Sequence, residues 1–132
     1  MSQKNVELVR EAFQAWYPND AAEFALHLDP AFEYEVTCGP EKGVYRGWQA
    51  KVDAFDQWQE PFSHYHWKAD DFIDAGDDHV VIPFAEGGHG KASGVQIEQR
   101  PAFVCAVREG KILRLSEYPT LPDALESAGL RA

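Results

Sequence analysis

Residues 95–118, VQIEQRPAFVCAVREGKILRLSEY, constrain the fold more than any other stretch of this sequence. Two runs of β-forming residues flank the tetrapeptide REGK at 108–111, where glycine suits the positive φ of a tight turn. The pattern predicts a β-hairpin in which Arg108 opposes Lys111. Both faces of this hairpin are substantially apolar, which indicates that both are covered in the folded protein.

Regular alternation from that turn places Ala102 opposite Glu117, with Arg100 one step beyond. The face that holds Glu117 also carries apolar residues, among them Val104, and we expect helices to cover it. The other face carries an apolar row made up of Ile97, Phe103, Cys105 and Val107. We expect a homodimer to form through this outer face, because an exposed apolar row is a liability in a monomer.

The length of 132 residues suits a single domain over residues 1–132, with a hydrophobic core that needs no disulfide or metal. The net charge of −10 disfavours nucleic acid and anionic membranes as partners. Cys38 and Cys105 are far apart in sequence, and we expect both to be reduced. We find neither a targeting leader nor an apolar run of membrane-spanning length, and we expect a soluble, cytoplasmic protein.

The first half of the sequence predicts three helices. Residues 5–16 predict an amphipathic helix, because apolar residues recur at a spacing of three and four. A short second helix is predicted over residues 21–28. A third helix is predicted from Trp48 onward and ends at Pro61.

The rest of the sequence predicts strands. Phe32, Tyr34 and Val36 alternate with glutamates, which predicts a strand with one apolar face. The other expected elements are a loop over residues 38–47, strands over 66–73 and 79–86, a glycine-rich loop over 87–94, the hairpin, and a last helix capped by Thr120. The sequence therefore predicts an α+β domain with a mainly antiparallel sheet.

The histidines and glycines do not predict a metal or nucleotide site. His64 and His66 alternate in a way that suits metal ligands, but the sequence offers no third ligand. The segment GGHGKASG at 87–94 fails as a phosphate loop, because Lys91 is followed by alanine and the segment lies between strands. We therefore expect no metal and no cofactor.

Three motifs carry a family resemblance: LDPAFEYEV at 28–36, YRGWQA at 45–50 and FVCAVREGKILRLSEY at 103–118. With these motifs the chain resembles SnoaL-like proteins of the nuclear transport factor two-like, or cystatin-like, superfamily. The resemblance implies a cone-shaped fold, in which a strongly curved sheet is packed on N-terminal helices around a central pocket. It also implies small-molecule chemistry similar to that of polyketide cyclases and ketosteroid isomerases.

The resemblance also points to candidate catalytic residues. SnoaL-like cyclases carry an acid near the end of the last strand, and Glu117 stands at the matching place. The hairpin pairing would bring Arg100 beside it, as a catalytic partner or as a structural ion pair. Ketosteroid isomerases carry an aspartate base on the first strand, and the matching residue here is Tyr34 or Glu35. The alternation turns Tyr34 inward, so that base is missing, which argues against a ketosteroid isomerase proper.

The expected ligand is a hydrophobic small molecule, polycyclic or carbonyl-containing. The predicted lining of the pocket is Phe13, Trp16, Tyr34, Trp48, Val52, Phe55 and Val104. The predicted function is an isomerase, cyclase or dehydratase that works by acid–base proton transfer. Two alternatives remain open: a module that binds a hydrophobic ligand without turnover, and a dimerisation module whose pocket is vestigial.

Overall fold

The structure is a computed structural model of the chain, and it describes residues 2–14, 21–40, 42–50, 52–53 and 62–129. Its elements are α1 (Ser2–Phe13), α2 (Ala21–Ala25), β1 (Leu28–Val36), β2 (Gly43–Arg46), β3 (Phe62–Ala69), β4 (Ile73–Gly76), β5 (His79–Gly90), β6 (Gln96–Gln99), β7 (Ala102–Arg108), β8 (Lys111–Tyr118) and α4 (Leu121–Ser127). Residues 48–50 and 52–53 are also helical. The predicted α+β class is confirmed.

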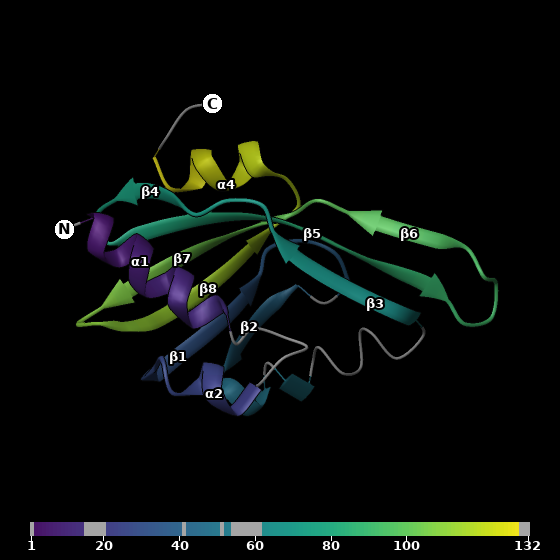
Figure 1. Cartoon of the computed structure of the whole chain (residues 1–132), viewed down its shortest axis with the longest axis horizontal. Coiled ribbons are helices and arrows are strands. Elements are labelled where there is room, and N and C mark those ends of the chain that lie inside the picture. Colours follow the sequence, from purple (N-terminus) through teal and green to yellow (C-terminus); the bar gives the residue numbers. More distant parts are fainter. Residues whose placement is uncertain (1, 15–20, 41, 51, 54–61, 130–132) are drawn as a thin grey trace.

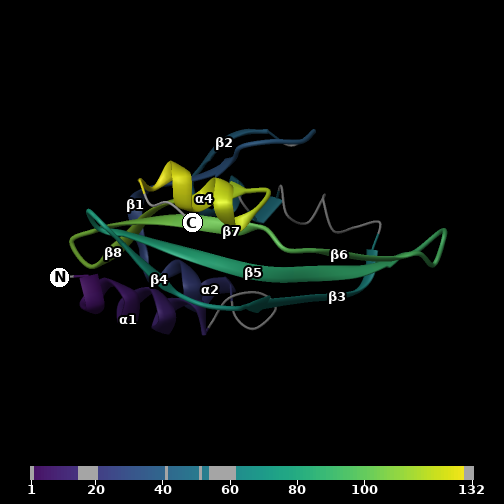
Figure 2. The ribbon, with the colours of Figure 1, turned by 90° about the horizontal axis from the view of Figure 1, so that it is seen from above.

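Eight strands form one strongly curved, open sheet (Figure 1). The main path runs β2-β1-β8-β7-β5-β3, while β4 and β6 pair with β5 outside that path. Only β1 and β8 are paired in parallel among the described strands, so the sheet is mainly antiparallel, as predicted. Figure 2 shows α1 and α2 on one face of the sheet and α4 on the other. We call these the α1 face and the α4 face.

The main core lies between the sheet and the helices α1 and α2. Val6, Val9 and Phe13 recur at helical spacing along α1 and are buried, which confirms the predicted apolar stripe. A smaller cluster lies under α4 and contains Ala75, Val81, Ala102, Val104 and Ala124. Because β5 and β7 contribute alternate side chains to the two clusters, both faces of the sheet are covered, as the apolar character of the hairpin predicted.

The predicted turn of the hairpin is confirmed, but the predicted pairing beyond it is wrong. Glu109 and Gly110 have φ values of 50° and 78°, which suit a two-residue hairpin turn. The register then shifts by one residue between Ala106 and Val107. As a result Glu117 opposes Phe103 instead of Ala102. Sequence alternation assumes a regular ladder, whereas an extra residue in one strand exchanges the faces of everything that follows.

The apolar row of β7 is not an exposed outer face. Phe103, Cys105 and Val107 belong to the main core on the α1 face, and Phe103 is only 2% exposed. Ile97, the fourth member, lies half-buried on β6. Helix packing within the chain therefore covers the row that was expected to join two subunits. Homodimerisation stays a prediction, without the support of this row.

Several boundaries also differ from the sequence prediction. Strand β1 begins at Leu28, so the second helix ends earlier than expected, and β2 lies inside the predicted loop. Strand β5 continues into the glycine-rich segment as far as Gly90. The glycines serve close packing there, because a Cβ on Gly87 would lie 2.4 Å from the carbonyl oxygen of Ile97 on β6. The last helix is confirmed: the hydroxyl of Thr120 caps it by accepting the backbone N–H of Asp123 at 3.2 Å.

Replacing Phe13 by alanine tests the main core. The ring of Phe13 is buried and lies 5.1 Å from that of Phe24 and 5.9 Å from that of Trp67, measured between centroids. We expect Phe13→Ala to lower the free energy of unfolding by about 3–5 kcal/mol, because it leaves a cavity among aromatic rings. Urea denaturation followed by circular dichroism measures this change.

Leu26→Ala is the matched control, since Leu26 is 66% exposed. Its free energy of unfolding should change by less than about 0.5 kcal/mol. Equal losses for the two variants would contradict the placement of the core.

Candidate functional site

Glu117 and Tyr34 form a hydrogen-bonded pair on the α1 face. β1 and β8 run parallel, with Tyr34 level with Leu115 and Val36 level with Glu117. The Tyr34 hydroxyl donates to Oε1 of Glu117 at 2.5 Å. Thr37 holds the backbone at the same point, because its N–H and its hydroxyl both donate to the carbonyl oxygen of Glu117, at 3.2 and 2.7 Å. The end of β8 is thus fixed in both its backbone and its side chain.

A second pair of the same kind lies on β3 and β5. The Tyr65 hydroxyl donates to Oε1 of Glu86 at 2.9 Å, and Glu86 is only 8% exposed. Glu86 opposes Trp67, which packs against the main core, so this carboxyl also belongs to the α1 face. Glu86 was not among the site residues predicted from the sequence. Its signal was present, because Glu86 continues the inward alternation of Ile82 and Phe84 along one strand.

Both pairs act electrostatically on the hydroxyl of Tyr34. Burial is the largest cause that raises the pKa of Tyr34 well above its usual range. The charge of Glu117 and its hydrogen bond to the hydroxyl raise this pKa further, and Glu86 and Tyr65 add smaller effects in the same direction. Tyr34 is therefore a neutral hydrogen-bond donor at neutral pH, and both carboxyls lie within its electrostatic range.

A continuous row of aromatic rings lies between the two pairs. Phe103 opposes Glu117, and its ring centroid lies 4.6 Å from that of Phe84. The next ring is Trp67, 5.3 Å from Phe84, and Trp67 opposes Glu86. The α1 face thus carries two carboxyls with tyrosine donors at the ends of an aromatic wall, whose members Phe84 and Phe103 are only 1% and 2% exposed. Carboxyls held in this way can accept and release protons.

Arg100 does not form an ion pair with Glu117. Its guanidinium binds the carboxylate of Asp70 at 3.3 Å and that of Glu98 at 3.5 Å, and the side chain is 67% exposed. The predicted ion pair between Arg100 and Glu117 is therefore wrong. The shift of register in the hairpin explains the error, since it moves Glu117 to the α1 face.

The predicted lining residues do not all lie on one face of the sheet. Phe13 and Tyr34 are buried in the main core, and Trp48 packs against it, with its ring 5.1 Å from that of Phe24. Val52 is half-buried. Val104 lies in the smaller cluster under α4, on the opposite face from Glu117. The two remaining residues, Trp16 and Phe55, lie outside the described part of the chain.

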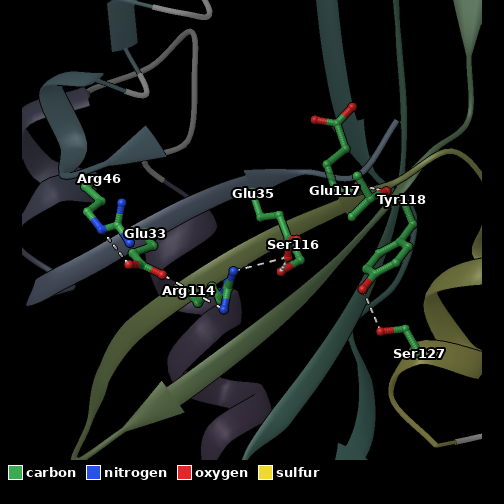
Figure 3. A network of polar contacts seen from close by, with 9 residues as sticks. Glu33, Glu35, Arg46, Arg114, Ser116, Glu117, Tyr118 and Ser127 are labelled. Atoms are coloured by element: carbon green, nitrogen blue, oxygen red, sulfur yellow. Dashed lines mark hydrogen bonds and ion pairs between the residues drawn. The ribbon is translucent and has the colours of Figure 1, made fainter. Parts of the chain in front are cut away.

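The other face of β1 and β8 carries an ion-pair network instead (Figure 3). Arg114 lies 3.4 Å from Glu35 and 3.9 Å from Glu33, and Glu33 also pairs with Arg46 at 3.1 Å. The Ser116 hydroxyl donates to Glu35 at 3.0 Å. Glu35 therefore faces away from Tyr34, and the predicted inward orientation of Tyr34 is confirmed by its burial.

Two further properties concern the described residues alone. Among them, no group of three or more histidine, cysteine, aspartate or glutamate side chains could hold a metal ion. None of the helices in this part of the chain has both the length and the apolar character needed to cross a membrane.

The SnoaL-like domain family matches residues 9–115, and the chain therefore belongs to this family. An NTF2-like protein from Burkholderia thailandensis is 27% identical, with a TM-score of 0.77 over 95% of this chain and 96% of that chain. A protein with a ketosteroid isomerase-like fold from Catenulispora acidiphila is 20% identical, with a TM-score of 0.69 over 94% and 93% of the two chains. No curated protein matches the sequence significantly. The resemblance and the fold expected from the sequence are confirmed, while the activity is not established by them.

The titration of Tyr34 tests the geometry of the site. Tyr34 should remain protonated above about pH 10, where ordinary tyrosines ionise. In Glu117→Gln its pKa should fall, because the negative charge and the carboxylate acceptor are both lost. Nuclear magnetic resonance of ring-labelled tyrosine, assigned with Tyr34→Phe, measures both values.

The same shift affects stability. The folded protein holds the proton of Tyr34 more tightly than the unfolded chain, so this contribution is complete below about pH 10 and is lost as the pH rises further. Ionisation of Tyr34 together with the exposed tyrosines would contradict the site geometry.

Proposed function

We propose that this protein is a small-molecule enzyme that moves protons on a hydrophobic, carbonyl-containing substrate. Glu117 is the proposed acid–base residue, and the reaction is an isomerisation, cyclisation or dehydration. The observation that carries the proposal is the hydrogen bond from the buried Tyr34 to Glu117 on an aromatic face. A carboxyl at an apolar face is costly unless it is hydrogen-bonded, and such groups are typical of catalytic sites.

The proposed step begins with ionised Glu117. A carboxylate has two oxygens and about four lone-pair sites, so it can accept the Tyr34 hydroxyl and still take a proton from the substrate. Glu117 removes a proton from the carbon next to the carbonyl, the electron pair of the C–H bond becomes a carbon–carbon double bond, and the π electrons of the carbonyl move to its oxygen to give an enolate. Return of that proton to a second carbon completes an isomerisation.

Tyr34 is a positioning residue in this proposal. Its hydrogen bond holds one oxygen of Glu117, which fixes the direction of the carboxylate relative to the aromatic wall. The raised pKa of Tyr34 supports this role, because a phenol that stays neutral remains a donor throughout the reaction.

The aromatic wall also supports a second candidate function. Within this wall Trp67 is half-buried and lies opposite Glu86, and a binding module needs nothing more than an aromatic surface and a polar anchor. The two candidates differ in one respect: only an enzyme needs Glu117 to exchange protons with the bound molecule.

Exchange of the α-hydrogens of α-tetralone for deuterium tests the enzyme proposal. This bicyclic aromatic ketone has a methylene group next to its carbonyl, and nuclear magnetic resonance in deuterated buffer follows the exchange. We expect the protein to accelerate the exchange, and Glu117→Gln to reduce the acceleration by roughly 10²-fold or more, the usual scale for a lost general base. Glutamine keeps the shape of the side chain and removes its basicity.

Glu35→Gln is the matched control, because Glu35 lies on the neighbouring strand and faces the opposite side of the sheet. Its exchange rate should equal that of the wild-type protein. Saturable binding of α-tetralone without accelerated exchange would overturn the enzyme proposal in favour of the binding module.

A further inference from the structure

Two histidines meet on β3 and β5, at a place that the proposed reaction does not use. The imidazole rings of His64 and His89 lie 5.3 Å apart between centroids, at an interplanar angle of 62°. Sequence alternation pairs His64 with His66, whereas the structure places the ring of His64 beside that of His89. His64 is exposed and His89 is half-buried, so an ion in solution can reach the pair.

An irregularity of β3 brings His64 to this position. The register between β3 and β5 shifts between Ser63 and His66, where three steps along β3 oppose two steps along β5. His64 lies within this bulge and has a φ of 56°, which residues other than glycine seldom adopt. Bulges redirect side chains, and strained backbone of this kind gathers at functional sites. The bulge therefore gives His64 a direction that a regular strand would not.

Ser63 fixes the position of the hydrogen on the His64 ring. The Ser63 hydroxyl donates to the carbonyl oxygen of His89 at 3.4 Å and lies 3.1 Å from Nδ1 of His64. A hydroxyl has one hydrogen, so with that hydrogen directed at His89 its oxygen can only accept from Nδ1. The neutral His64 ring then carries its hydrogen on Nδ1 and its lone pair on Nε2. This is the state in which a histidine binds a metal ion, with its other ring nitrogen donating to a neighbour.

The separation of the two rings also suits a shared metal ion. Zinc binds histidine nitrogen at about 2.0–2.1 Å in tetrahedral geometry, which puts the centres of two imidazole rings on one ion about 5 Å apart. The separation of 5.3 Å between His64 and His89 agrees with this arrangement. Within the described part of the chain, no third histidine, cysteine or carboxylate joins the pair as a possible ligand. The site therefore offers two protein ligands and leaves the other positions to water.

We propose that His64 and His89 bind a divalent transition-metal ion such as Zn²⁺, with Ser63 orienting the ring of His64. Imidazole is a good ligand for zinc, copper and nickel, and the net charge of −10 attracts cations in general. The bound ion links β3 to β5 across the bulge. The inference is independent of the proposed function, because His89 has the opposite phase to Glu86 along β5 and lies on the other face of the sheet.

Titration of the protein with zinc chloride tests the site. The protein is freed of any affinity tag and treated with a chelator, and calorimetry should then show one saturable zinc ion per chain. His64→Asn and His89→Asn should each weaken binding by at least about tenfold, since loss of even a group that orients a ligand costs about 10–100-fold in affinity. Asparagine tolerates a positive φ, so His64→Asn should keep the local fold.

Two further variants separate metal binding from packing. His79→Asn is the matched control, because His79 lies at the other end of β5, and it should bind zinc as tightly as the wild-type protein. Ser63→Ala keeps both histidines and removes the hydroxyl that orients His64. Its zinc affinity should fall by about tenfold while the stoichiometry stays at one ion per chain. A hydroxyl that only packed in the bulge would not change the zinc affinity.

Thermal unfolding gives a second readout. Zinc should raise the melting temperature of the wild-type protein but not that of His64→Asn or His89→Asn, because an ion that binds only the folded chain stabilises it. A wild-type protein that binds no zinc would overturn the proposal. Equal zinc affinity in His64→Asn, His89→Asn and His79→Asn would overturn it as well, because the ion would then bind elsewhere on the surface.

Discussion

The hydrogen bond between Tyr34 and Glu117 is the interaction on which the site depends. It joins the first strand to the last, the one parallel pairing among the described strands, and it places a polar contact at the edge of an aromatic core. One register shift in the hairpin makes it possible. Without the extra residue, Glu117 would oppose Ala102 and lie on the α4 face of the sheet. The ion pairs of Arg114 lie on that face.

Glu117 reaches the α1 face through an irregularity of the sheet, whereas Glu86 reaches it by regular alternation along β5. The shift in β8 turns Glu117 toward α1, and the glycines after Glu86 let β3 and β6 pair closely with the end of β5. Tyr65 and Glu86 are thereby held on adjacent strands within hydrogen-bond distance. The register shift thus positions Glu117, and the glycines allow the close strand pairing beside Glu86. Both are common roles of bulges and of glycines in strands.

The sequence predicted the family, the α+β class, the apolar stripe of α1 and the inward orientation of Tyr34, because each depends on a local period or motif. It did not predict the partner of Glu117. Arg100 was expected there by regular alternation, which contains no information about an irregular ladder. Glu86 escaped notice because the glycines beside it were taken for the start of a loop, although its inward phase along β5 was a usable signal.

The central claim is that buried Tyr34 binds Glu117 within electrostatic range of the Tyr65–Glu86 pair, and the pKa of Tyr34 in Glu86→Gln tests it most directly without any substrate. We predict that this variant lowers the pKa of Tyr34, because the negative charge of Glu86 opposes ionisation of the phenol in the native protein. Glu98→Gln should leave the pKa of Tyr34 unchanged. A pKa of Tyr34 that responds to Glu117→Gln but not to Glu86→Gln would contradict this placement of Glu86 near Tyr34.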